Sequence, residues 1–128
     1  MKGLSDNIVN TVLIIDDDQR NIFALKAVLK SRSVNAVCAG SAAEGLALLN
    51  SDPAIRLVLI DMMMPDMDGY EAIREIRRGG RSSLPVVAVT AQAMTGDRDK
   101  CLAAGADAYL SKPIDVDQLM ELVNRMFK

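Results

Sequence analysis

The residues of this chain that are best suited to chemistry stand where apolar runs end. One such run ends in a single carboxylate, Asp61, and another ends in the pair Asp16 and Asp17. Two further runs end at Thr90 and at Lys112. Two charges about 4 Å apart interact by about 4 kcal/mol at an effective dielectric constant near 20. If these runs are strands of one sheet, their three carboxylates come together at its edge. They are tolerable there only with a cation among them or with raised pKa values.

These groups predict a hard divalent cation held by oxygen atoms. Lys112 supplies one positive charge, but Mg²⁺ coordinated by carboxylates, a carbonyl and waters would supply more. The sequence contains no histidine, and Cys38 and Cys101 stand apart from the ends of these runs, which argues against zinc. The two cysteines are more simply interpreted as reduced thiols in the core.

A carboxylate nucleophile, Mg²⁺, a hydroxyl and an ammonium group form the set needed for phosphoryl transfer onto aspartate. In this interpretation Asp61 is the acceptor, the metal ion and Lys112 neutralise the phosphoryl oxygens, and Thr90 donates a hydrogen bond. Pro113 follows the lysine directly and can fix the turn that aims the lysine over the sheet edge.

Five strands and five helices are expected to alternate along the chain. The strands are expected at residues 11–15, 34–39, 56–61, 84–89 and 107–111. The helix signals include a capping box at Ser41–Glu44, stops at Gly79-Gly80 and Gly105, and a cap at Asp115. Alternation with short connections predicts an α/β fold with a doubly wound parallel sheet. Ligands then bind outside the carboxyl ends of its strands.

Composition limits the function further. A chain of 128 residues has the length of one domain, and its net charge of −2 argues against a nucleic-acid or anionic-membrane partner held by charge. The first seven residues lack the apolar core of a signal peptide, and no apolar run approaches the length of a membrane span. We therefore expect a cytoplasmic protein without membrane insertion.

Four motifs, in this order and at this spacing, make the chain similar to the receiver domain of two-component response regulators. They are Ile14-Ile15-Asp16-Asp17-Asp18, Asp61-Met62-Met63-Met64-Pro65-Asp66-Met67-Asp68-Gly69, Val89-Thr90-Ala91, and Ala104-Gly105-Ala106-Asp107-Ala108-Tyr109-Leu110-Ser111-Lys112-Pro113. The resemblance implies that residues 1–10 are an N-terminal extension and that residues 11–128 are the receiver domain. It also implies a flavodoxin-like (βα)5 fold with a five-stranded parallel sheet in the order 2-1-3-4-5.

The resemblance assigns a role to each acidic residue of the site. Asp61 would be the phosphoacceptor and a ligand of Mg²⁺. Asp17 would bind the ion directly, and Asp16 would bind it through water. The backbone carbonyl of Met63 would be the third protein ligand.

The same resemblance assigns the switch. Thr90, Ala91 and Lys112 would contact the phosphoryl group, and Tyr109 would be the aromatic residue whose rotamer follows activation. Phosphorylation would reshape the surface formed by the fourth helix, the fifth strand and the fifth helix, through which a phosphorylation-dependent dimer could also form. The chain would then be a signalling domain that phosphorylates and dephosphorylates itself, and not an enzyme in the usual sense.

A partner has to supply the phosphohistidine, because this chain has no histidine. The resemblance implies a sensor histidine kinase or a histidine phosphotransfer protein. The segment Asp18-Gln19-Arg20-Asn21 is similar to that of receivers in hybrid sensor kinases. We therefore expect either a free-standing regulator or a receiver from a larger protein such as a hybrid kinase.

Two residues are placed to tune the loss of the phosphoryl group. Met63 stands two residues after the acceptor, and Gln92 stands two residues after Thr90, so both are expected to flank the water that attacks the phosphorus atom. A methionine offers this water no useful hydrogen bond, and Gln92 brings no charge to activate it. The sequence therefore predicts slow self-dephosphorylation.

Three other functions remain open at this point. A haloacid-dehalogenase-type enzyme also uses an aspartate nucleophile with Mg²⁺, but Arg20 stands where its Asp-x-Asp-x-Thr motif requires Thr or Val, and the chain lacks room for a substrate-selecting cap. A flavodoxin-like cofactor binder would meet repulsion between the aspartates at Asp16–Asp18 and the cofactor phosphate. The third is a receiver that serves as a docking surface without phosphorylation, which none of the motifs favours.

The remaining charged residues have plainer interpretations. Asp18 is expected to cap a helix or stand in its first turn, and Asp66 and Asp68 are expected to be turn residues. Three arginines near the end of one helix are expected to favour the helix macrodipole and solubility: Arg74, Arg77 and Arg78.

Overall fold

In a computed structural model, residues 10–91 and 97–127 are described, and they form one parallel sheet and five helices. The strands are β1 (Thr11–Ile15), β2 (Asn35–Ala39), β3 (Ile55–Asp61), β4 (Val86–Thr90) and β5 (Ala108–Ser111). The helices are α2 (Gln19–Ser31), α3 (Ala42–Ser51), α4 (Gly69–Arg78), α5 (Asp97–Ala104) and α6 (Val116–Met126). The strand order β2-β1-β3-β4-β5 confirms the predicted doubly wound topology.

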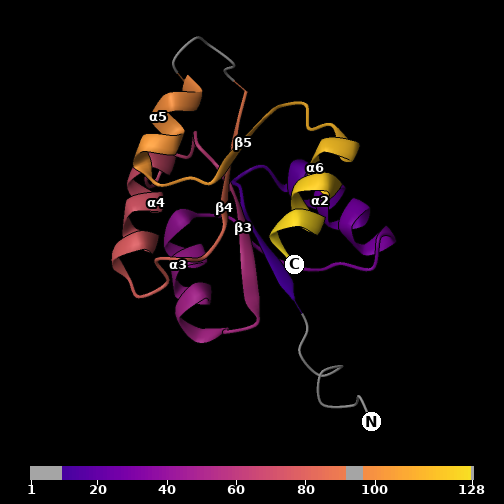
Figure 1. Ribbon diagram of the computed structural model, residues 1–128, viewed down its shortest axis with the longest axis horizontal. Coiled ribbons are helices and arrows are strands. Elements are labelled where there is room, and N and C mark those ends of the chain that lie inside the picture. Colours follow the sequence, from indigo (N-terminus) through magenta and orange to yellow (C-terminus); the bar gives the residue numbers. More distant parts are fainter. Residues whose placement is uncertain (1–9, 92–96, 128) are drawn as a thin grey trace.

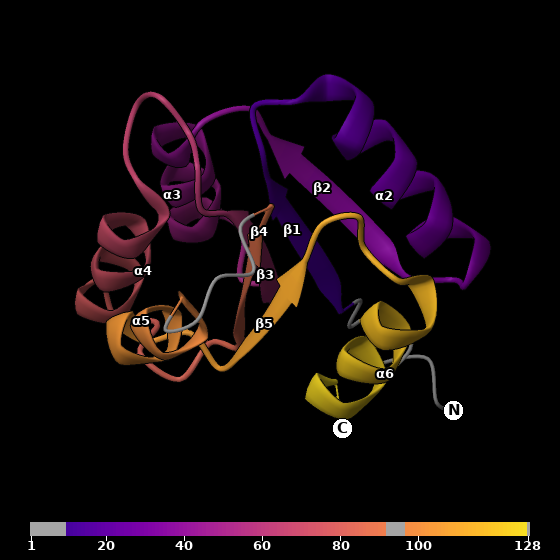
Figure 2. The same cartoon turned by 90° about the horizontal axis from the view of Figure 1, so that it is seen from above.

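Helices cover both faces of the sheet. Figures 1 and 2 show α3, α4 and α5 on one face and α2 and α6 on the other. Along β3, Val58 and Ile60 pack into the core on the side of α3 and α4, whereas Leu57 and Leu59 pack into the core on the side of α2 and α6. Because alternate residues of a strand point to opposite faces, a strand covered on both sides has to be apolar throughout.

Each helix whose start is described begins at a residue that accepts one of its free N–H groups. Asp18, Ser41, Asp68 and Asp115 are the N-caps of α2, α3, α4 and α6, in that order. The predicted capping box at α3 is present in altered form, since the Glu44 carboxylate accepts from the N–H of Gly40 rather than from that of Ser41. The sequence had marked three of these caps, whereas Asp68 was expected only as a turn residue.

Strand boundaries differ from the prediction by one or two residues. β2 begins at Asn35 and β4 at Val86, each later than expected, and β3 begins earlier, at Ile55. At β4 the cause is Pro85, which has no N–H to give to the sheet and contributes only its carbonyl, to the N–H of Val58.

In the part of the chain that the structure describes, no helix is long and apolar enough to cross a membrane.

One glycine sets how closely α4 approaches the end of β3. Gly69 is the first residue of α4, and its N–H donates to the carbonyl of Met62 at 3.2 Å. A Cβ atom at this position would lie 2.6 Å from the backbone Cα of Met62. The start of α4 can therefore pack against the residue that follows Asp61 only because position 69 has no side chain.

Replacing Gly69 with alanine should lower the free energy of unfolding by about 1–3 kcal/mol, because backbone atoms would have to move apart. This is expected although alanine is the better helix former by about 1 kcal/mol. Urea denaturation measures the change. Gly40→Ala is the matched control, since its Cβ would meet nothing closer than 3.7 Å; an unchanged stability of the Gly69 variant would contradict the packing argument.

Candidate functional site

The register of the sheet brings the predicted site residues to one level. Ile15 of β1 pairs with Ile60 of β3, so the next residues, Asp16 and Asp61, leave neighbouring strands side by side. On the other side of β3, Asp61 pairs with Val89 of β4. The carboxyl ends of three strands that are far apart in the sequence therefore meet at one edge of the sheet.

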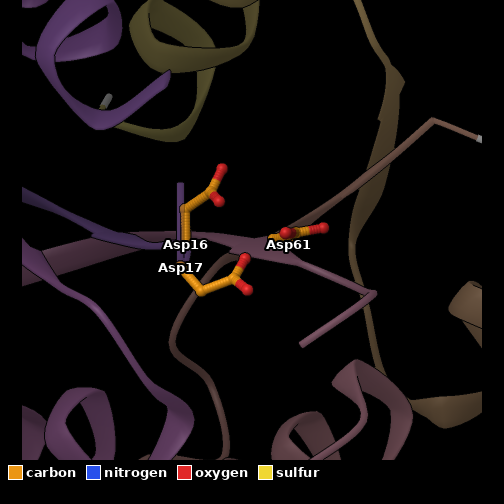
Figure 3. Close-up of side chains that lie close together, drawn as sticks. All are labelled: Asp16, Asp17 and Asp61. Carbon is orange, nitrogen blue, oxygen red and sulfur yellow. The ribbon is translucent and has the colours of Figure 1, made fainter. Parts of the chain in front are cut away.

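Three carboxylates form a cluster at this edge. Each of Asp16, Asp17 and Asp61 offers an oxygen atom, and these atoms lie within 4.8 Å of one another. Figure 3 shows Asp16 and Asp17 leaving the end of β1 beside Asp61 at the end of β3. Asp16 and Asp61 are only 2% and 5% exposed, whereas Asp17 is exposed. The cluster thus has a buried base and an open side.

Asp16 is fixed by groups of the protein itself. Its Oδ1 accepts from the N–H of Asp18 at 2.9 Å, and its Oδ2 accepts from the side-chain amide of Asn21. The ammonium of Lys112 lies 3.5 Å from Oδ2. Sequence reasoning missed Asn21; the available signal was its position in the first turn of a helix capped by Asp18, which turns it back towards the strand end.

Asp61 has fewer partners than Asp16, and its pKa is shifted. Its Oδ1 accepts from the N–H of Met63 at 3.1 Å, and its Oδ2 lies 3.6 Å from the ammonium of Lys112. Burial is the main cause that raises the pKa of Asp61 above its ordinary value, and the charge of Asp16 raises it further. The Met63 N–H and Lys112 act in the opposite direction without cancelling the effect.

The donor set fits a hard divalent cation. All three side chains offer oxygen, and one ammonium leaves two of the three negative charges uncompensated. Mg²⁺ prefers oxygen ligands and keeps several waters, which the open side at Asp17 allows. The cluster could therefore hold a metal ion, and such an ion would lower the repulsion between the carboxylates.

The residues predicted to contact a phosphoryl group lie at the same edge. Thr90 is buried at the end of β4, and its carbonyl accepts from the N–H of Lys112 at 2.8 Å. The bond from Lys112 to Pro113 is cis, and the lysine side chain reaches the carboxylates as the sequence predicts. Ala91 follows β4 and is exposed.

Tyr109 belongs to a second polar cluster, on the α5 side of the sheet. Its hydroxyl lies 3.5 Å from the carboxylate of Asp97, at the start of α5. The hydroxyl of Tyr70, from α4, donates to the other oxygen of Asp97 at 2.8 Å. Burial and this hydrogen bond raise the pKa of Tyr70. The shared carboxylate, which the sequence had not marked, connects α4, α5 and β5.

Of the two residues predicted to tune dephosphorylation, the structure describes only Met63. Met63 is 59% exposed, whereas its neighbours Met62 and Met64 are buried. Of these three methionines, Met63 is therefore the one exposed to solvent beside Asp61. Gln92 lies outside the described residues.

Asp18, the second acid of a haloacid-dehalogenase-type motif, instead caps α2 by accepting from the N–H of Arg20.

Fold and site together define a doubly wound α/β domain with an acidic pocket at the carboxyl edge of its sheet. A family model for the response regulator receiver domain matches residues 12–124. The chain therefore belongs to the response regulator receiver domain family, whose members act in two-component signal transduction and phosphorelays.

Relatives include both regulators and kinases. The response regulator Rre1 of Synechocystis is 39% identical over 91% of this chain, and the sensor histidine kinase RcsC of Escherichia coli is 36% identical over 94% of it. The chain spans 51% of the length of the regulator and 12% of that of the kinase.

Solved structures agree with the fold. A receiver protein from Pseudomonas putida superposes with a TM-score of 0.86 at 33% identity, covering 91% of this chain and 97% of the other. The receiver domain of Ssk1, solved with the histidine phosphotransfer protein Ypd1 from Saccharomyces cerevisiae, gives 0.85 at 23% identity, covering 92% of this chain and 88% of the other.

Asp61→Asn should raise the free energy of unfolding at about pH 7 when EDTA keeps metal ions away. Because the folded state raises the pKa of Asp61 above 3.8, it binds more protons than the unfolded state just above that pH. The stability of the wild type therefore falls as the pH rises above 3.8, whereas the variant has no carboxylate to ionise at this position. In the variant, Lys112 keeps its contact with Asp16.

Urea denaturation at a series of pH values measures this difference, which should shrink below pH 3.8. Glu121→Gln, which removes one charge from an exposed position of α6, is the control and should change little. A less stable Asp61 variant at neutral pH would show that the ion pair with Lys112 outweighs the burial of the charge.

Proposed function

We propose that this chain is the phosphoacceptor domain of a two-component phosphorelay and that Asp61 accepts the phosphoryl group. The observation that carries the proposal is the position of Asp61 at the end of β3, where it is 5% exposed and lies beside two other carboxylates and an ammonium. A carboxylate oxygen of Asp61 attacks phosphorus, the phosphorus–nitrogen bond of the donor phosphohistidine breaks, and the imidazole leaves with that electron pair.

The residues of this chain supply the rest of the site. Asp17, Asp61 and the backbone carbonyl of Met63 would hold Mg²⁺, and Asp16, whose oxygens already bind Asn21 and Lys112, would contribute through water. Bound Mg²⁺ neutralises negative charge on the transferred oxygens. Lys112 can move its ammonium from the carboxylates to the phosphoryl group, and Thr90 and the backbone N–H of Ala91 donate hydrogen bonds to it.

A partner protein has an apolar surface to bind next to the site. Phe23 of α2 is 77% exposed. Beside this helix, a groove of about 270 Å³ runs between α2 and α6, and Asn21 and Lys112 from the acidic site line it together with Val116. The continuity of groove and site supports docking of a histidine kinase or a histidine phosphotransfer protein here.

Phosphorylation would then change the surface of α5, β5 and α6. A hydrogen bond from Thr90 to the charged phosphoryl group contributes about 1.5–3 kcal/mol, whereas moving an equilibrium from 1:99 to 99:1 requires about 5.5 kcal/mol. The switch is therefore partial until a downstream partner, or a second copy of this chain, binds the changed surface. When Tyr109 turns inward it leaves Asp97, which keeps its shorter bond to Tyr70.

Incubation with acetyl phosphate and Mg²⁺ should add the mass of one phosphoryl group to the chain, in a form that hydroxylamine removes. Intact-protein mass spectrometry measures the product. Asp61→Asn should abolish the addition, and EDTA should suppress it, because the transferred oxygens then lack their counter-charge. Full labelling of the Asn variant at another aspartate would refute the assignment.

Met63→Asn should speed loss of the phosphoryl group severalfold, which corresponds to about 1 kcal/mol in the barrier. The reason is that the exposed methionine covers the approach of water to Asp61 and offers it no hydrogen bond, whereas asparagine can bind and orient water. Decay of the phosphorylated protein after removal of acetyl phosphate gives the rate. Met63→Leu, which keeps an apolar cover, should decay like the wild type; equal decay of all three proteins would exclude a shielding role.

A further inference from the structure

An acidic side chain outside the carboxylate cluster connects the loop after β3 to a helix that lies far from it in the sequence. Asp66 lies in the loop between β3 and α4, and its two carboxylate oxygens accept from the N–H groups of Ala42 at 3.3 Å and Ala43 at 3.2 Å. Ala42 and Ala43 are the first two residues of α3. This loop also carries Met63, the residue whose carbonyl is expected to bind the metal ion.

The start of α3 is incomplete without this contact. The first N–H groups of a helix have no partner within the helix. Ser41 accepts from the N–H of Glu44 with its side chain and from that of Gly45 with its carbonyl. The N–H groups of Ala42 and Ala43 are the ones that Asp66 accepts from, and its negative charge suits the positive end of the helix dipole.

The loop is fixed at both of its ends close to Asp61. The N–H of Met62 donates to the carbonyl of Val89 at 3.0 Å, and the N–H of Met63 donates to Asp61 itself. At the other end, Asp68 caps α4. Between these anchors, Asp66 links the loop to the start of α3, which lies on the same face of the sheet as α4 (Figure 2).

We infer that Asp66 is a positioning residue for the Asp61 site. By holding the loop against the start of α3, it fixes the backbone carbonyl of Met63 relative to the carboxylates of Asp17 and Asp61. This inference rests on the proposed function of Asp61 and adds a residue that touches neither the metal ion nor the phosphoryl group.

The test compares variants that remove different features of the same contact. Asp66→Ala should raise the dissociation constant for Mg²⁺ about fivefold; this is less than the 10–100-fold typical of a group that bonds a metal ligand directly, because Asp66 acts through the backbone. Asp66→Asn keeps one acceptor oxygen and should give an intermediate value. Titration with Mg²⁺, followed by NMR, measures both.

Two controls separate positioning from stability and from charge. Ser41→Ala removes another acceptor from the start of α3 without touching the loop, so it should lower the stability and leave the affinity for Mg²⁺ unchanged. Glu44→Gln removes one negative charge at the same helix end while keeping an acceptor for Gly40, and it should also leave the affinity unchanged.

The amide resonance of Met63 gives a second measurement that needs no metal ion. It should shift in Asp66→Ala and stay in place in Ser41→Ala. An unshifted Met63 resonance or an unchanged Mg²⁺ affinity in Asp66→Ala would overturn the inference, as would an equal loss of affinity in either control. If wild-type protein binds Mg²⁺ but acetyl phosphate does not modify Asp61, the proposed function fails while the comparison of affinities still decides the role of Asp66.

Discussion

The site depends on keeping two buried carboxylates beside each other with a single ammonium between them. Asp16 and Asp61 are both almost fully buried, and Lys112 lies 3.5 and 3.6 Å from them. Buried charges are tolerated when they are paired and hydrogen-bonded. Asp16 meets this condition through Asn21 and a backbone N–H, so the unrelieved part of the repulsion falls on Asp61. Under the proposed function, this carboxylate, which is destabilised as a free anion, would be stabilised by bound cations.

The sheet supplies the rigidity that this arrangement needs. β1 and β3 are apolar on both faces, and every residue of β1 is buried. Their register places Asp16 beside Asp61, and the N–H of Asp18 and the side chain of Asn21 then hold the Asp16 carboxylate in place. The loops that follow these strands are then free to carry exposed residues such as Asp17 and Met63, which is the usual division between scaffold and functional loop.

Local periodicity predicted the strand-end residues, and the resemblance to the receiver family predicted the strand order. They could not predict contacts in which a side chain reaches a backbone group far along the chain. Arg77 was expected to be a solvated helix residue, yet its guanidinium donates to the carbonyl of Gly105 and pairs with Asp107 at 2.8 Å. Asp66 lies in a bend of the loop, as expected, but it also accepts from the start of α3. Periodicity says which face of a helix is buried, but not which loop meets its end.

The position of Tyr109 shows how the proposed signal could leave the site. Thr90 pairs with Ser111 in the sheet, and the N–H of Lys112 donates to the carbonyl of Thr90, so β4 and β5 are joined next to the carboxylates. Tyr109 stands two residues before Ser111 on the same strand, with Asp97 of α5 beside its hydroxyl. A shift of Thr90 towards a phosphoryl group would therefore act on β5 directly, while the bond from Tyr70 keeps α5 attached to α4. Under the proposed function, the turn of the Tyr109 side chain would change the surface that β5 forms with α5 and α6, where a partner would bind.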